Sequence, residues 1–198
     1  MIIIGLTGSI ASGKSTIAKH IKKLKIPIHE SDYFISCLYK KPTREFMQKL
    51  KKIGFANAIK KNKIDKSALR EIFFNNKNKK KLLEKYLHHK VKKDRNKFVE
   101  KNKKQKIVFL DIPLLFEKKL EHTCDYVLCA YAPLSIRERR ATQRKGMNKQ
   151  LFNLISSNQI KDSEKKTKSD YIINTTLTKP KTFAKVEKIL KNITKQTK

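Results

Sequence analysis

GLTGSIASGKST, at residues 5–16, is the stretch that decides the fold of this 198-residue chain. It fits the pattern G-x-x-x-x-G-K-[S/T], with Gly8, Gly13, Lys14 and Ser15 at the fixed positions. Glycines let the backbone curl tightly and turn successive N–H groups inward, which makes a concave site for phosphate oxygens. At this spacing Lys14 reaches the outer phosphates, and the Ser15 hydroxyl is a ligand for Mg²⁺. The stretch therefore predicts a loop that holds a triphosphate.

The segments on either side of this phosphate loop (residues 8–16) support the prediction. MIIIGL before it is a short apolar, β-branched run of the kind found in buried parallel strands. Residues 15–24 carry apolar side chains at helical spacing, so the phosphates would lie at a helix N-terminus, where the dipole favours negative charge. An accidental Gly-Ser turn is the alternative, and the order strand, loop, helix argues against it. The loop residues assigned to the nucleotide are Ala11, Ser12, Gly13, Lys14, Ser15 and Thr16.

The high positive charge of the chain suggests a different class of function, nucleic-acid binding. Its formal net charge is +32 and its isoelectric point is near 10.1, values that suggest a nucleic-acid-binding protein. However, only 7 of the 49 basic residues are arginine, and the lysines are spread along the whole chain. A generally solvated lysine surface accounts for this pattern. We therefore expect no specific nucleic-acid partner, and only non-specific electrostatic binding.

Other features bear on the compartment. No apolar run approaches the roughly 20 residues needed to span a bilayer, and the N-terminus lacks the layout of a signal peptide. The three cysteines, Cys37, Cys124 and Cys129, form no C-x-x-C pair. These features predict a cytoplasmic protein with no membrane partner and no zinc site.

The alternation of apolar runs and helical patterns predicts an α/β fold with a parallel sheet flanked by helices. The runs that indicate strands lie at residues 2–6, 26–29, 107–110, 126–130 and 171–173.

The gap between the second and third strands is too long for a single crossover, and the pattern predicts a helical insertion at residues 33–105. Thr43 and Asp65 are suitable helix starts, and Gly54 is a suitable stop. The segment 75–81 is the expected loop within the insertion. At the other end of the chain, the polar tail after Thr194 is expected to fray.

Two carboxylates follow predicted strands. In an open parallel sheet, ligands bind beyond the carboxyl ends of the strands. Asp32, after the second strand, is placed to orient a substrate hydroxyl towards a γ-phosphate, and an N-cap for the helix that follows is the equal alternative. Asp111, after the third strand, is favoured as a ligand of Mg²⁺ over a residue that caps a turn.

Arginine is concentrated in one segment, SIRERRATQRKG, which holds four of the seven arginines. On a helix that ends at Gly146, Arg137, Arg140 and Arg144 share one face, whereas Arg139 points elsewhere. Guanidinium groups match phosphate oxygens bidentately, so this face suits a lid over a triphosphate. A solvated basic face is the alternative.

Taken together, these segments resemble the dephospho-CoA kinase family. The matching segments are GSIASGKST, ESDYF, YLHHKV, DIPLLFE, RRATQRKG and EKKTKSDYIIN, in the family's order over about residues 3 to 176. The resemblance implies that ATP phosphorylates the ribose 3′-hydroxyl of dephospho-CoA, the last step to coenzyme A. It implies that Asp32 is the base that orients the acceptor, that His88 contacts the substrate, and that Arg144 acts from the lid together with Arg140.

The resemblance also implies three regions. Residues 1–32, 106–136 and 165–198 form the nucleotide-binding core, residues 33–105 hold dephospho-CoA, and residues 137–164 form the lid segment.

The chain departs from the family at a few positions. The family's histidine usually precedes proline, whereas His89 follows His88 here, and a lone helical histidine is more often a packing or surface residue. Ser9 and Ala11 occupy loop positions that are often glycine. An arginine of the family's lid is replaced by Ile155 or a neighbour. Another small-molecule or nucleotide kinase with the same loop is the alternative of the same class.

Overall fold

The structure is a computed structural model that describes residues 1–196. The chain folds into two compact units. The sheet unit comprises Met1–His29 and Asn102–Lys198, and the helical unit comprises Glu30–Lys101. The last helix continues to Gln196, so the expectation of fraying after Thr194 is wrong for residues 195–196, and residues 197–198 lie outside the described part.

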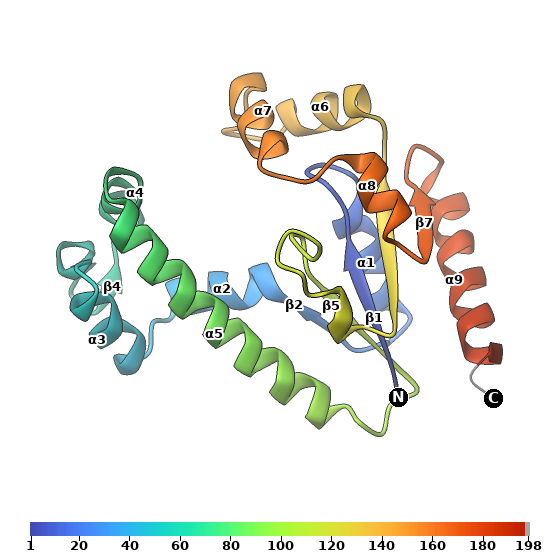
Figure 1. Cartoon of the computed structure of the whole chain (residues 1–198), viewed down its shortest axis with the longest axis horizontal. Helices are drawn as coiled ribbons and strands as arrows, with labels where there is room; N and C mark the ends of the chain where they lie inside the picture. The colour runs from blue at the N-terminus through green and yellow to red at the C-terminus, as the bar shows by residue number, and fades with distance from the viewer. Residues whose placement is uncertain (197–198) are drawn as a thin grey trace. The chain divides into compact units, whose positions relative to one another are not determined.

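A five-stranded sheet forms the centre of the sheet unit, as predicted (Figure 1). The strand order is β2-β5-β1-β6-β7, so β1, which leads into the phosphate loop, is the central strand. It pairs in parallel with β5 on one side and with β6 on the other, and β6 pairs in parallel with β7. The strands are β1 (Ile2–Thr7), β2 (Ile28–Glu30), β5 (Ile107–Asp111), β6 (Tyr126–Tyr131) and β7 (Tyr171–Asn174).

Helices α1 (Lys14–Lys23) and α9 (Lys179–Gln196) pack together on this sheet. Their buried apolar side chains, such as Ile17, Ile21 and Ile189, join the apolar residues of β1, β5 and β6 in one core. A fully buried side chain of this size contributes about 1.5–3 kcal/mol to stability. This core fixes α1 behind the phosphate loop, with its N-terminus at the carboxyl edge of β1.

Three shorter helices follow β6, namely α6 (Leu134–Thr142), α7 (Lys149–Ser157) and α8 (Asp162–Thr167). The expectation that α6 continues to Gly146 is wrong. After Thr142 the chain forms successive turns, with the Arg144 amide donating to the Ala141 carbonyl at 2.9 Å. Arg144 therefore lies beyond the helix and does not share a helical face with Arg137 and Arg140.

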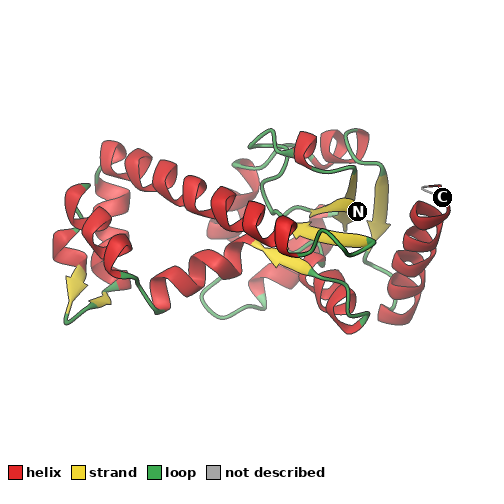
Figure 2. Cartoon of the chain, turned by 90° about the horizontal axis from the view of Figure 1, so that it is seen from below, coloured by secondary structure: helices red, strands yellow, loops and turns green. Residues whose placement is uncertain are grey.

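The helical unit has its own apolar core around Phe46, Leu50, Phe55 and Leu83. Figure 2 colours the helices of the chain red and its strands yellow. Its elements are α2 (Ser31–Lys40), α3 (Arg44–Lys52), the 3-10 turn η1 (Ala56–Ala58), β3 (Ile59–Lys60), β4 (Lys63–Ile64), α4 (Lys66–Asn75) and α5 (Lys77–Lys101).

The predicted helix starts and stop in this unit are confirmed. The Thr43 hydroxyl accepts a hydrogen bond from the Phe46 amide at 3.1 Å, at the start of α3. The Asp65 carboxylate caps α4, and its bonds from Lys60 and from the first amides of the helix hold its pKa below the usual value. Gly54, with φ of 89°, follows the end of α3.

Two features of this unit differ from the expectation. The predicted loop at residues 75–81 is wrong, because Asn76 alone separates α4 from α5 and accepts a hydrogen bond from the Lys79 amide at 2.9 Å. The short β3–β4 hairpin was not predicted. Lys61 and Asn62 both have positive φ at its turn, a conformation for which lysine gives no sequence signal.

Candidate active site

The phosphate loop has the tight geometry that its glycines predict. Gly8 has no room for a side chain, since a Cβ there would lie 2.5 Å from the Ala130 carbonyl oxygen. Gly13 has φ of 89° and directly precedes α1, the helix whose N-terminus faces the loop. Ala11 also has a left-handed backbone, with φ of 59°. Such a conformation costs a non-glycine residue about 1–2 kcal/mol, so neighbouring groups must hold the loop in place.

Lys14 and Asp111 meet at this loop. The Lys14 ammonium forms an ion pair with Asp111 Oδ1, at the carboxyl end of the adjacent strand β5. Both side chains are largely buried, with exposed fractions of 15% for Lys14 and 9% for Asp111. The sequence therefore placed both residues at the same edge of the sheet, and the structure brings them into contact.

The groups present fit a bound Mg²⁺. Ser15 lies in the first turn of α1 and supplies a hydroxyl, while Asp111 supplies a carboxylate. Both are oxygen ligands, the kind that Mg²⁺ prefers, and this ion usually takes one or two protein ligands and completes its shell with phosphate and water. Among the described residues, no group of three or more His, Cys, Asp or Glu side chains is placed to hold a metal without such help.

Arg140 and Thr175 close one side of the loop. Arg140 Nη1 donates to Thr175 Oγ1 at 2.9 Å, and its Nη2 donates to the Thr175 carbonyl at 2.7 Å. The Thr175 hydroxyl in turn donates to the Ser12 carbonyl at 2.6 Å. A pocket of about 320 Å³ opens here, lined by Ala11, Gly13, Thr16, Arg140, Arg144, Thr175, Leu177, Lys179 and Thr182.

Sequence reasoning missed Thr175 and the residues that follow it. They come directly after β7, at the same carboxyl edge as the phosphate loop, so their position after a predicted parallel strand was the available signal. Arg140 and Arg144 both line this pocket, as the lid interpretation requires. Arg137 does not line it, because its guanidinium is buried elsewhere against the phosphate loop.

The arrangement around Thr175 leads to the first prediction. Thr175→Val keeps the side-chain volume and removes the hydroxyl that joins Ser12 to Arg140. Because each net hydrogen bond contributes about 0.5–1.5 kcal/mol, we expect the free energy of unfolding to fall by about 1–3 kcal/mol, and the KM for the nucleotide to rise. Urea denaturation and steady-state kinetics measure the two effects. Thr176→Val, at an exposed neighbour, is the control, and equal effects of both variants would contradict the assignment.

In the helical unit, Asp32 lies in the first turn of α2 and is exposed. The N-cap of this helix is Glu30, so the interpretation of Asp32 as the N-cap is wrong. At this position the carboxylate interacts favourably with the helix dipole and remains accessible to a ligand.

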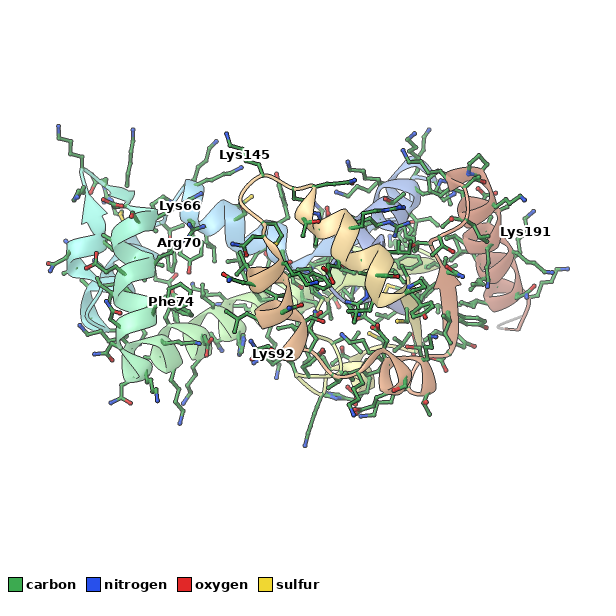
Figure 3. All side chains as sticks on the ribbon, turned by 90° about the horizontal axis from the view of Figure 1, so that it is seen from above. Lys66, Arg70, Phe74, Lys92, Lys145 and Lys191 are labelled. Atoms are coloured by element: carbon green, nitrogen blue, oxygen red, sulfur yellow. The ribbon has the colours of Figure 1, made fainter. Side chains whose placement is uncertain are left out.

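Asp32 opens onto a pocket of about 530 Å³ inside the helical unit. Residues 32, 35, 36 and 39, on one face of α2, line this pocket. Residues 66, 69, 70, 73 and 74, on one face of α4, line it as well. Figure 3 shows Lys66, Arg70 and Phe74 following one another along one side of α4. Burial raises the pKa of Tyr39 to about 12, so its hydroxyl stays neutral. The pocket thus combines two acids, Asp32 and Glu84, with two cations and aromatic walls.

His88 is not among the residues that line this pocket. It lies on α5 with an exposed side chain, directly after Leu87, which does line the pocket. The structure therefore does not bring His88 and Asp32 to the same pocket. The cations and aromatic side chains of α4 were not predicted, because lysine and phenylalanine on a helix give no functional signal by themselves.

Two further observations concern the cysteines and the helices. Cys37, Cys124 and Cys129 are free thiols, and burial raises the pKa of Cys129, which keeps this thiol protonated. In the described part of the chain, no helix combines the length and the apolar character needed to cross a membrane.

Comparison with known proteins identifies the family. The family model CoaE, dephospho-CoA kinase, matches residues 2–179. The chain is 37% identical over 198 residues to the dephospho-CoA kinase of Bartonella quintana (strain Toulouse), with 98% of this chain and 100% of that protein covered.

Solved structures agree with this assignment. The dephospho-CoA kinase from Campylobacter jejuni has a TM-score of 0.73 at 29% identity, and the match covers 99% of this chain and 98% of that one. Protein TT1252 from Thermus thermophilus has a TM-score of 0.79 at 29% identity, and the match covers 96% of this chain and 95% of that one. The chain therefore belongs to the dephospho-CoA kinase family.

Proposed function

We propose that the sheet unit of this chain binds ATP and Mg²⁺, that the helical unit binds dephospho-CoA, and that the γ-phosphate passes to the ribose 3′-hydroxyl. The product is coenzyme A, so the reaction is the final step of its biosynthesis. The observation that carries this proposal is the contact of Lys14 with Asp111 at the phosphate loop. A kinase needs a cation for the outer phosphates and an acid for the metal, and Lys14 and Asp111 supply these two groups in contact with each other.

On the nucleotide side, the backbone amides of Ala11 to Thr16 and the N-terminus of α1 hold the phosphates. Ser15 and Asp111 would hold Mg²⁺, which neutralises charge that develops on the phosphate oxygens. Arg140 and Arg144, which line the pocket beside the loop, stabilise that same charge from the lid segment. Phosphoryl transfer through a loose transition state needs little covalent help, so this positioning carries most of the rate.

On the acceptor side, Asp32 accepts a hydrogen bond from the 3′-hydroxyl and orients it for attack. The pocket beside it fits a nucleotide-like acceptor, because Lys66 and Arg70 match a diphosphate and Phe74 offers a face for a base. Phe74 has 73% of its surface exposed, so its ring is accessible to a ligand. A substrate contact by His88 remains a prediction from the family resemblance.

The decisive experiment is turnover of dephospho-CoA with ATP and Mg²⁺, followed by mass spectrometry of the product. We expect one added phosphoryl group on the 3′-hydroxyl, and no turnover once the metal is chelated. A parallel panel of nucleosides, nucleotides and small alcohols, read by ADP release, tests the alternative kinase. A higher kcat/KM for any member of the panel than for dephospho-CoA would contradict the acceptor assignment.

The proposed acceptor pocket leads to the second prediction. Arg70→Gln removes a guanidinium that donates to the acceptor's diphosphate. Hydrogen bonds to charged groups contribute about 1.5–3 kcal/mol, so we expect the KM for dephospho-CoA to rise at least about tenfold while the KM for ATP stays unchanged. Arg70→Lys keeps the charge and loses the bidentate geometry, so it should have an intermediate effect.

Arg44→Gln is the matched control for this experiment. Arg44 lies in the same unit, is exposed at the start of α3, and does not line the pocket. It should leave both KM values unchanged. Equal KM values for dephospho-CoA in the Arg70 and Arg44 variants would exclude Arg70 from the acceptor site.

The proposed setting is the cytoplasm, where free cysteines such as those of this chain stay reduced. We propose no specific nucleic-acid partner, since the arginines that were singled out line or support the nucleotide site.

A further inference from the structure

The outer half of the phosphate loop carries side chains at two positions where the family often has glycine. Ser9 is buried, with 6% of its surface exposed, and Ala11 has the left-handed backbone described above. The left-handed backbone of Ala11 carries a cost for a residue with a Cβ, so contacts from outside the loop must favour this shape. These contacts identify what holds it.

Three hydrogen bonds join the loop to the segment that runs from α6 to α8. The Ser9 hydroxyl donates to Asp162 Oδ1 at 2.6 Å, and the Ile10 amide donates to Gln159 Oε1 at 2.9 Å. The Ile10 carbonyl accepts from Arg137 Nη1 at 3.4 Å. Ala11 adds apolar contact with Phe152 and its neighbours. The residues that hold the loop, Arg137, Gln159 and Asp162, do not line the pocket beside it.

Asp162 joins the Ser9 hydrogen bond to the Arg137 hydrogen bonds. Its second oxygen, Oδ2, accepts from Arg137 Nη2 at 2.5 Å, and the Arg137 side chain is only 5% exposed. Arg137 is further fixed by donating from Nε to the Ala132 carbonyl at 3.2 Å. The Asp162 carboxylate is therefore pinned in one orientation, and a pinned acceptor gives the Ser9 hydroxyl a fixed partner. Gln159 and Asp162 flank the second end of the lid segment, and Arg137 begins it.

We propose that Asp162 is a positioning residue that holds the phosphate loop in its phosphate-binding shape and anchors the lid segment to that loop. It acts through Ser9 and Arg137 and does not touch the nucleotide. The proposal rests on the ATP site proposed above. It assigns to Arg137 a support role, distinct from the lid role of Arg140 and Arg144, and it explains why an arginine that shares their segment is buried.

The test measures ATP affinity directly, by calorimetric titration of the full chain with ATP and Mg²⁺. Asp162→Ala should weaken ATP binding about tenfold, a change of about 1.4 kcal/mol. The KM for ATP should rise by the same factor, while the KM for dephospho-CoA stays unchanged. Asp162→Asn should weaken ATP binding less than Asp162→Ala does. The Asn amide oxygen still accepts from the Ser9 hydroxyl, although the side chain no longer carries the negative charge that neutralises Arg137.

A double-mutant cycle tests the connection to Ser9. In a Ser9→Ala background the hydroxyl is already absent, so Asp162→Ala should weaken ATP binding less than it does in the unmodified chain. Additive effects of the two substitutions would show that Asp162 does not act through Ser9, and would overturn the proposal.

Asp125→Ala is the control for a merely structural role. The Asp125 carboxylate accepts from the Ile3 amide at 2.7 Å, at the opposite end of β1 from the loop. This variant should lower the melting temperature without changing ATP affinity. If Asp162→Ala behaves in the same way, or leaves ATP affinity unchanged, the proposal is wrong. Because the titration needs no acceptor, an error in the assignment of dephospho-CoA would appear only in the turnover assay.

Discussion

Lys14→Ala is expected to lower kcat/KM for ATP by at least about 10²–10³-fold, the usual cost of removing one preorganised group that stabilises transition-state charge. We expect the ammonium to contact the outer phosphates as their charge develops. Steady-state kinetics with dephospho-CoA and ATP measure the loss. Lys19→Ala, on the exposed side of α1, is the matched control and should retain full turnover. Turnover of the Lys14 variant at the unmodified rate would contradict the phosphate-loop assignment.

The ion pair adds a second expected result for the same variant. Without Lys14, the mostly buried Asp111 carboxylate loses a partner. A hydrogen bond to a charged group contributes about 1.5–3 kcal/mol, so we expect the unfolding free energy to fall by up to that amount. A Lys14→Ala/Asp111→Ala double variant should lose less stability than the sum of the two single variants, without regaining turnover, because each single variant already removes this ion pair. A double variant that loses as much stability as that sum would show that the pair does not act as a unit.

Asp32→Asn is expected to lower kcat by roughly 10²–10⁴-fold, the span typical of a positioned general base. We expect the lower part of that span, because a loose transition state removes little charge from the acceptor until late, and orientation then matters more than basicity. The Asn oxygen still accepts from the 3′-hydroxyl, so the KM for dephospho-CoA should change little. Measuring kcat, KM and the melting temperature together separates a loss of catalysis from a loss of stability.

The position of Asp32 in the helix makes this test sharper. Since Asp32 lies in the first turn of α2 and is not its N-cap, the stability cost should be limited to the dipole interaction, about 0.3–1 kcal/mol. Glu71→Gln, an exposed carboxylate-to-amide change on α4 outside the pocket, is the control. An unchanged kcat together with a normal melt would mean that another group orients the hydroxyl.

The sheet was predictable because each of its strands has a local signature. Buried parallel strands are continuous apolar runs, and all five appear in the sequence at nearly their final bounds. Knowing that the strands are parallel then places Lys14 and Asp111 at one edge without any knowledge of distances. Helix caps such as Thr43 and Asp65 were equally accessible, since their hydrogen bonds reach only two or three residues along the chain.

The supports of the site were not predictable, because they join residues far apart in sequence. Asp162 follows Ser9 by 153 residues, and nothing in either neighbourhood indicates the other. The same is true of the buried pair between Lys165 and Glu117, which joins Nζ to Oε1 at 2.8 Å. Glu117 ends the segment DIPLLFE, whose likeness to the family was clear, but its partner came only from the fold.

The acceptor pocket illustrates a different reason. Its cations and aromatic residues lie on α4, where the sequence KSALREIFFN shows only an ordinary amphipathic helix. Whether these side chains can bind a ligand depends on which face of α2 they oppose. The incorrect prediction of a loop at residues 75–81 also left the end of α4 undefined. Local patterns define elements well, but they do not define which surfaces face each other.

The contact between Lys14 and Asp111 has a consequence for how ligands bind. We expect the three N–H donors of Lys14 to be shared between Asp111 and a phosphate once a nucleotide is bound, which weakens the contact with the carboxylate. Asp111 should then be a better ligand for a divalent cation than it is in the free protein. We therefore expect ATP and the metal to be coupled through this pair, so that each increases the affinity for the other by the same factor.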